Sequence, residues 1–185
     1  AGENNLAVVE LLLTSGAALD ARSDKGFTAL LFAAREGHSE IVESLLNHGA
    51  DITESLPARA GIITENGTGT ATQTGMNGLL LAAGSAHFET AALLLEAGAD
   101  PNDMRSGFTP LHTMSWVRKP DSSDRGDPAP VGSGELGALE FIRTIVALGA
   151  DVNLPLNEGA PRQPNSASRI ESGGSTPFLL AADRA

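Results

Sequence analysis

The chain has 185 residues, with 23 acidic and 12 basic side chains and a formal net charge of −11 at pH 7. It contains no Cys, which excludes disulfides, Cys-ligated metal sites and thiol nucleophiles. The acidic balance argues against binding to a nucleic-acid backbone, and the sequence has no apolar run of about 18 residues that would span a membrane.

Hydrophobic periodicity predicts a series of short helices. In four segments apolar residues recur at i, i+1, i+4 and i+5, with Thr90 as the polar exception, and each segment ends at a Gly-Ala pair whose Gly suits a helix C-cap. A second landmark is a Thr or Asn N-cap followed by apolar residues, often with an Ala pair. The predicted helices cover residues 4–14, 29–36, 39–47, 78–85, 88–96, 110–116, 136–147 and 177–183.

The spacing of these landmarks predicts repeated units with inserts. The first two Gly-Ala pairs are 33 residues apart, whereas the next two intervals are 49 and 51 residues. The additional residues have the Gly-, Pro-, Ser- and Thr-rich composition of loops. We expect a single array over 1–185, with units at about 1–19 (partial), 20–52, 53–101, 102–152 and 153–185 (partial), and inserts at about 54–75, 118–136 and 154–175.

These landmarks resemble the ankyrin repeat. Thr-Pro-Leu-His at 109–112 matches the motif that opens its inner helix, Gly-His at 37–38 its interhelix turn, and Gly-Ala-Asp-Val-Asn at 149–153 its closing turn. The inserts resemble those of long-insert ankyrin proteins common in bacteria. The resemblance implies an all-α solenoid of stacked helix-turn-helix units with short hairpin-like turns and three long loop inserts. Because the chain starts in an outer helix and ends in an inner one, it reads as a fragment with apolar surface exposed at both ends.

Motifs associated with catalysis or metal binding occur without the structural context that they need. Gly132, Gly134 and Gly137 have the spacing of a dinucleotide-binding loop, but prolines occupy the place where that loop needs a strand. We interpret them as the end of an insert. His38 and His87 fall at the same position of successive units, and His48 and His112 lie elsewhere in theirs, so we do not expect the four histidines to converge on one metal ion. We therefore expect no catalytic residue, no metal site, no cofactor and no enzymatic activity.

The resemblance implies a protein-interaction scaffold, in which rigid helix pairs present a preorganised surface. The contact positions of the family are turn residues and the two positions after the Ala pair of the inner helix. Carried onto this chain, they give the partner-binding residues Arg22, Asp24, Lys25, Phe27, Arg35, Glu36, Met104, Arg105, Phe108 and Trp116. Phe32 is expected to pack between units. For Trp116 a second interpretation stays open, in which its ring anchors the insert that follows.

The expected partner is another protein, and the acidic surface makes a basic partner one option. Neither nucleic acid nor membrane insertion is expected. Two alternatives remain: a targeting or regulatory arm of a longer enzyme whose catalytic domain lies outside this segment, or a purely structural spacer. A spacer predicts bland, polar turns, whereas Phe27, Met104 and Phe108 favour binding. The sequence assigns no compartment.

Overall fold

The computed structural model describes residues 5–57, 74–115, 132–157 and 173–183. The β-structure found within these ranges is an isolated antiparallel bridge between Ser55 and Asn77. The described chain is therefore all-α, as predicted. Its helices are α1 (Leu6–Thr14), α2 (Ala29–Glu36), α3 (Ser39–Asn47), α4 (Gly78–Gly84), α5 (Phe88–Glu96), α6 (Pro110–Thr113), α7 (Ala138–Ala147) and α8 (Pro177–Asp183).

The helix that shortens most relative to its prediction is α6, which ends at Thr113 instead of at residue 116. The Thr113 hydroxyl donates to the Thr109 carbonyl at 3.2 Å, and the Ser115 hydroxyl donates to the His112 carbonyl at 2.8 Å. Side chains that bond backbone carbonyls in this way compete with helix continuation. The sequence around residues 113–115 therefore stops α6 after about one turn.

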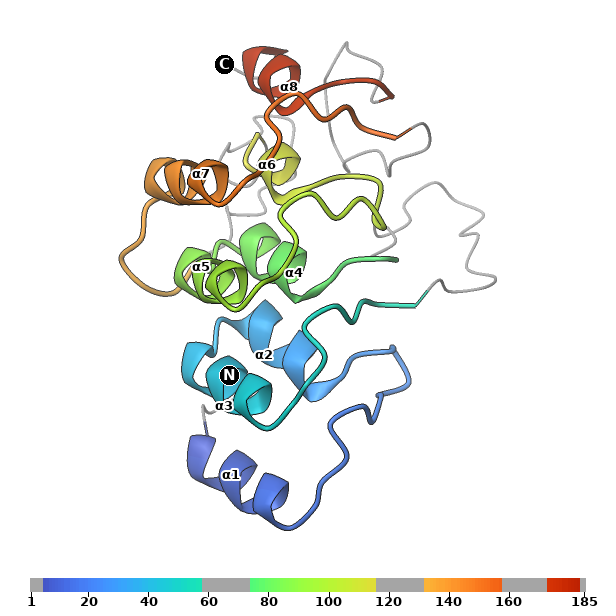
Figure 1. The fold of residues 1–185 in the computed structure, drawn as a ribbon, viewed down its shortest axis with the longest axis vertical. Coiled ribbons are helices and arrows are strands. Elements are labelled where there is room, and N and C mark those ends of the chain that lie inside the picture. Colours follow the sequence, from blue (N-terminus) through green and yellow to red (C-terminus); the bar gives the residue numbers. More distant parts are fainter. Residues whose placement is uncertain (1–4, 58–73, 116–131, 158–172, 184–185) are drawn as a thin grey trace, which may run out of the picture.

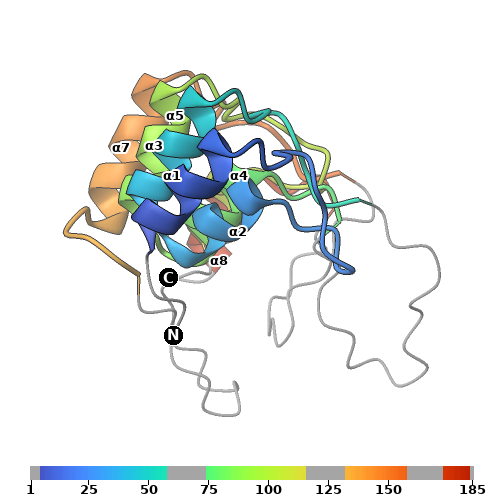
Figure 2. The same ribbon diagram turned by 90° about the horizontal axis from the view of Figure 1, so that it is seen from below.

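The helices stack in two rows along the long axis of the molecule (Figure 1). In the inner row α2, α4, α6 and α8 contact one another in chain order, and in the outer row α1, α3, α5 and α7 do the same. Figure 2 looks along the stack and shows the turns between pairs extending from one edge, beyond the inner row. This arrangement is the predicted α-solenoid.

One apolar core runs continuously from α2 to α7. Ala34 and Ala83 are fully buried where α2 packs on α4, because small side chains let two helices approach closely. On the outer row, Phe88 of α5 stacks on Phe141 of α7 with ring centroids 5.2 Å apart. The core therefore lies between successive helix pairs, and each pair depends on its neighbours for burial.

Polar side chains also join neighbouring helices of the outer row. Thr90 is fully buried, and its hydroxyl lies 2.8 Å from that of Ser39 on α3. The hydroxyl of Ser44 on α3 donates to the carboxylate of Glu10 on α1. The polar exception in the apolar stripe is thus a hydrogen-bonded group, as buried polar atoms usually are.

Side chains at the two ends of the described stack are more exposed than the apolar pattern alone suggests. Leu45, Leu94 and Ile145 are buried as expected, but Val146 is 40% exposed. The apolar stripe predicts a buried Val146 as well, and this prediction is wrong because α7 is the last outer helix of the described stack and packs mainly on α5. The other exposed apolar side chains at the ends are Val8, Leu11 and Leu12 on α1 and Phe178 and Leu179 on α8.

Replacing a leucine that lies between pairs should therefore cost far more than replacing an exposed valine at the end. We expect Leu94→Ala to lower the free energy of unfolding by about 2–5 kcal/mol, because it leaves a cavity in a packed core. Val146→Ala is the control and should cost less than about 1 kcal/mol. Urea unfolding followed by circular dichroism measures both, and a loss below about 1 kcal/mol for Leu94→Ala would contradict the core assignment.

Candidate functional site

The turns before α2, α4 and α8 close with the same backbone hydrogen bond although their lengths differ. Before α2, the Ser23 N–H donates to the Phe27 carbonyl at 2.9 Å. Before α4, the Leu56 N–H donates to the Met76 carbonyl at the same distance, although many more residues lie between them. The long turn is thus closed at its base like the short one.

A buried leucine lies at the base of each of the two long turns. Leu56 has this place before α4, and Leu156 has it before α8, where its N–H donates to the Ser175 carbonyl at 2.9 Å. Each leucine packs on the short-turn pair that precedes it. The residues clustered with Leu56 are Phe27, Leu31 and Leu81, and those clustered with Leu156 are Leu80, Phe108 and Leu180.

Phe27 and Phe108 therefore do not form a contact surface. Phe27 is 4% exposed and Phe108 is 6% exposed, because Leu56 and Leu156 lie against them. The prediction that these two phenylalanines contact a partner is wrong. A residue in a turn is not necessarily exposed here, because the turn of the next pair covers each of these two rings.

The exposed aromatic side chain of this region is Phe32 on α2. It is 39% exposed, so the expectation that it packs between units is wrong. Its ring stacks on Phe27 with centroids 4.7 Å apart. The Arg35 guanidinium lies 4.8 Å from the Phe27 centroid and 5.1 Å from the Phe32 centroid, and it pairs with Glu36 at 2.6 Å. The buried ring of Phe27 thus packs against both the Arg35 guanidinium and the exposed ring of Phe32.

Arg22 is tied into the turn edge. It donates to the carbonyls of Gly26 at 2.8 Å and Ser55 at 3.2 Å, and it forms an ion pair with Glu54 at 3.6 Å. The Glu54 carboxylate also accepts a hydrogen bond from the hydroxyl of Thr28, the N-cap of α2. Burial raises the pKa of Glu54, and the contacts with Thr28 and Arg22 oppose this rise.

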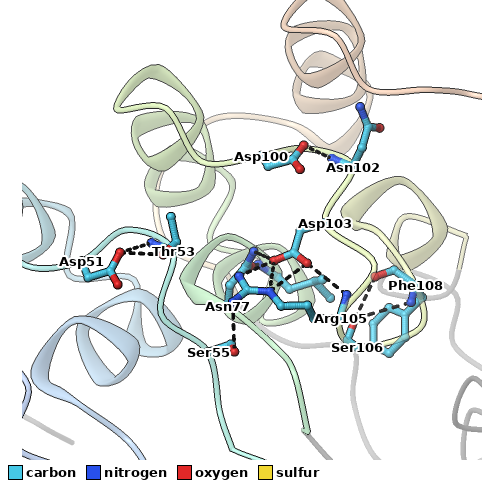
Figure 3. Close-up of polar contacts among 11 residues, drawn as sticks. Asp51, Thr53, Ser55, Asn77, Asp100, Asn102, Asp103, Arg105, Ser106 and Phe108 are labelled. Atoms are coloured by element: carbon cyan, nitrogen blue, oxygen red, sulfur yellow. Dashed lines mark hydrogen bonds and ion pairs between the residues drawn. The ribbon is translucent and has the colours of Figure 1, made fainter.

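Arg105 is tied down in a similar way (Figure 3). It pairs with Asp103 at 2.5 Å and donates to the Ser55 hydroxyl at 3.3 Å. Asp103 also accepts from the Asn77 amide at 2.8 Å, and Asn77 caps α4 by accepting from the Leu80 N–H at 2.9 Å. Burial alone would raise the pKa of Asp103, but the bonds from Arg105 and Asn77 outweigh it, and the pKa is lowered.

The networks of Glu54 and Asp103 repeat the same contact in successive turns, in which a carboxylate binds the N-cap residue of the preceding inner helix. Glu54 and Asp103 each lie 26 residues after the helix cap that they bind. Before α6 a different residue holds the cap, because the buried His112 accepts the Thr109 N–H on its Nδ1 at 3.1 Å. Burial lowers the pKa of His112, and the Ser175 carbonyl opposes this shift. The turn edge is therefore fixed mainly by internal contacts.

The remaining predicted contact residues divide by exposure. Asp24, Lys25 and Glu36 are exposed, and Met104 is half-buried. Trp116 lies outside the described residues, so both interpretations of it stay open. Most of each expected insert also lies outside the described residues. Within the described ranges, no group of three or more His, Asp or Glu could hold a metal ion, and the helices there are too short to cross a membrane.

A comparison with protein-family models gives a match to the description "Ankyrin repeats (3 copies)" over residues 1–55. This match supports an ankyrin-repeat protein. Residues 1–55 contain α1 to α3, and the later helices continue the same stacking. Ankyrin repeats generally mediate protein–protein interaction and are typically non-catalytic. Among the predicted positions, the partly exposed Arg35 and the exposed Glu36 form an ion pair, with the exposed ring of Phe32 beside them.

The opposite pKa shifts of the two cap-binding carboxylates can be tested. At pH 7 we expect Asp103→Asn to lower the free energy of unfolding by about 1–2 kcal/mol, at the low end for a charged hydrogen bond because Arg105 is half exposed. Since the pKa of Asp103 is lowered in the folded state, this contribution is present above the usual carboxyl pKa near 4 and is lost as the pH falls through the folded value.

Glu54→Gln is the matched control, because Glu54 binds the equivalent cap while burial disfavours its charge. It should cost less than Asp103→Asn at pH 7. Urea unfolding at pH 7 and at pH 3 measures both variants. Equal losses at pH 7, or a loss for Asp103→Asn that is unchanged at pH 3, would contradict this account of the turn edge.

Proposed function

We propose that this ankyrin array is a non-catalytic scaffold that binds another protein at the exposed face of α2, centred on Phe32 and Arg35. The stack of these two side chains on the buried Phe27 supports the proposal. A surface already fixed in place loses little conformational entropy on binding. Aromatic residues and Arg are also enriched in the buried centres of protein interfaces.

The next described inner helix, α4, does not repeat this combination, which favours α2 over α4 as the centre of binding. Leu81 on α4 has the place of Phe32 but is buried in the cluster with Leu56. Gly84 has the place of Arg35, so α4 presents no long side chain there. A partner that crosses from α2 to α4 would therefore meet Phe32 and Arg35 as the protruding group of these two helices, with Glu36 beside it.

The burial of two turn phenylalanines removes part of the case against a purely structural spacer. Two of the three turn residues that argued against it, Phe27 and Phe108, are buried and say nothing about a partner. Phe32 and Arg35 now carry that argument. A targeting or regulatory arm of a longer enzyme would use the same surface, so it differs in what is attached and not in how this segment binds.

The acidic balance of the chain favours a partner with basic groups around the contact. The net charge of −11 creates a field that attracts cationic surfaces and weakens with salt. Arg35 is already paired with Glu36, so it does not demand an acidic residue from the partner. We therefore propose a partner segment with an apolar side chain for Phe32 and flanking Lys or Arg.

A binding experiment with matched variants tests this proposal. Peptides selected from a displayed random library on the folded segment would be titrated against wild type, Phe32→Ala and Arg35→Ala by calorimetry. We expect Kd to rise about tenfold or more in both variants, as for hot-spot residues, and the selected peptides to be enriched in Lys and Arg. Circular dichroism confirms that each variant is folded.

Leu139→Ala is the control for non-specific apolar binding, because Leu139 on α7 is 71% exposed and lies on the outer row. Its Kd should match that of wild type. Peptides whose affinity is unchanged by Phe32→Ala and Arg35→Ala, or reduced equally by Leu139→Ala, would contradict the proposed surface.

A further inference from the structure

A short segment before α7 contacts the interhelix turns of two earlier helix pairs. This strap comprises residues 132–136, and in Figure 1 the light-orange chain before α7 descends to the level of α5. The Ser133 N–H donates to Nδ1 of His87 at 3.0 Å, and the Ser133 hydroxyl lies 2.9 Å from the same atom. The hydroxyl also donates to the Gly37 carbonyl at 3.4 Å. The strap thus touches the interhelix turns of two preceding pairs.

A second contact fixes the other end of the strap. The Glu89 carboxylate, in the first turn of α5, accepts the backbone N–H groups of Glu135 at 2.7 Å and Leu136 at 3.3 Å. The strap is therefore held by two side chains of one helix start, His87 and Glu89. Both contacts are made by its backbone, so they do not depend on the identity of most strap residues.

The glycines of the strap are explained by this close approach. A Cβ on Gly132 would lie 1.8 Å from the Ala86 carbonyl oxygen. Gly134 has φ +85°, and a Cβ there would lie 2.1 Å from the Glu89 carboxylate. Two glycines of the spacing that resembles a dinucleotide-binding loop thus allow the strap to approach the Ala86 backbone and the Glu89 carboxylate closely.

The bond between Ser133 and His87 requires a neutral imidazole. A backbone N–H can only donate, so Nδ1 of His87 must carry a lone pair. The proton of the neutral ring is then on Nε2, and the Arg35 carbonyl is a backbone acceptor beside this ring. A protonated imidazole carries hydrogen on both nitrogens and has no acceptor for the Ser133 N–H.

We propose that the strap and His87 form a pH-sensitive clamp, closed when His87 is neutral and open when it is protonated. This inference does not depend on the proposed binding surface. Opening breaks the His87 contact and detaches the start of the strap from the turn between α4 and α5. A proton taken up from solvent is the only reactant.

The charges around His87 set the direction of the switch. Burial lowers the pKa of His87 and outweighs the rise due to Glu36 on α2, while His38 in the turn before α3 adds to the lowering. Among the described residues, Glu89, which accepts the strap's N–H groups, and the strap residue Glu135 are further carboxylates at the clamp. Because the pKa is lowered, the clamp is closed at and above the usual histidine value near 6.5 and opens as the pH falls through the lower folded pKa.

Amide hydrogen exchange of Ser133, measured by NMR on the whole 185-residue chain and corrected for intrinsic rates, tests the clamp. Between pH 7.5 and about one unit below the midpoint of the His87 ring titration, read from the same spectra, we expect its protection to fall about tenfold or more as the hydrogen bond is lost. In His87→Asn the side-chain oxygen can still accept the N–H but does not titrate, so protection should stay constant over this range. His38→Gln, at the equivalent position of the preceding pair, should keep the pH-dependent loss of protection, with its midpoint moved upward because His38 no longer lowers the pKa of His87.

Protection that falls equally in wild type and His87→Asn would overturn the proposal, and so would protection that is constant in wild type. If His87→Asn does not fold, the wild type alone decides. The Ser133 amide chemical shift must then titrate with the midpoint of the His87 ring, below 6.5, and a different midpoint or a midpoint above 6.5 overturns the clamp.

Discussion

Burial of apolar side chains between successive helix pairs is the interaction on which the rest of this structure depends. Ala34 and Ala83 let the inner helices approach, and Phe88 and Phe141 continue the same core along the outer row. A pair on its own has no closed core, so water is removed from its apolar face only by the neighbouring pair. The polar groups in these contacts, such as Thr90, are hydrogen-bonded to the adjacent helix.

The fixed stack also explains how the turns can differ in length. The turns before α2, α4 and α8 are closed at their bases by backbone bonds in the same register, and the caps of α2 and α4 are tied to carboxylates of the turn that follows. Where the turn is long, Leu56 or Leu156 adds an apolar anchor. Added chain at the tip therefore leaves the spacing of the helix pairs unchanged, since the entropy of a longer loop rises only slowly with length.

The helices were predictable from the sequence because their apolar periodicity and terminal glycines are local signals. The exchange of roles between Phe27 and Phe32 was not, since Leu56, which covers Phe27, lies in a segment whose composition indicates a loop. Exposure of Arg35 and Glu36 agrees with the positions implied by the family resemblance.

The strap could not have been foreseen, because its contacts join residues about 46 positions apart and are made by backbone groups. The only signal in the sequence was the run of glycines at 132–137, which marks close backbone approach without naming the partner. Likewise, the carboxylates that hold the caps look like ordinary surface charges until the stack brings Glu54 to Thr28 and Asp103 to Asn77.

The central claim, that each pair is stabilised by its neighbours, is tested most directly by native-state hydrogen exchange along the whole array. In the described structure α4 and α5 each contact helices on both sides in the stack, whereas α1 contacts α3 and α8 contacts α6. The account predicts the highest protection for amides of α4 and α5 and the lowest for those of α1 and α8. Equal protection in all of these helices, or protection in α1 as high as in α4, would contradict it.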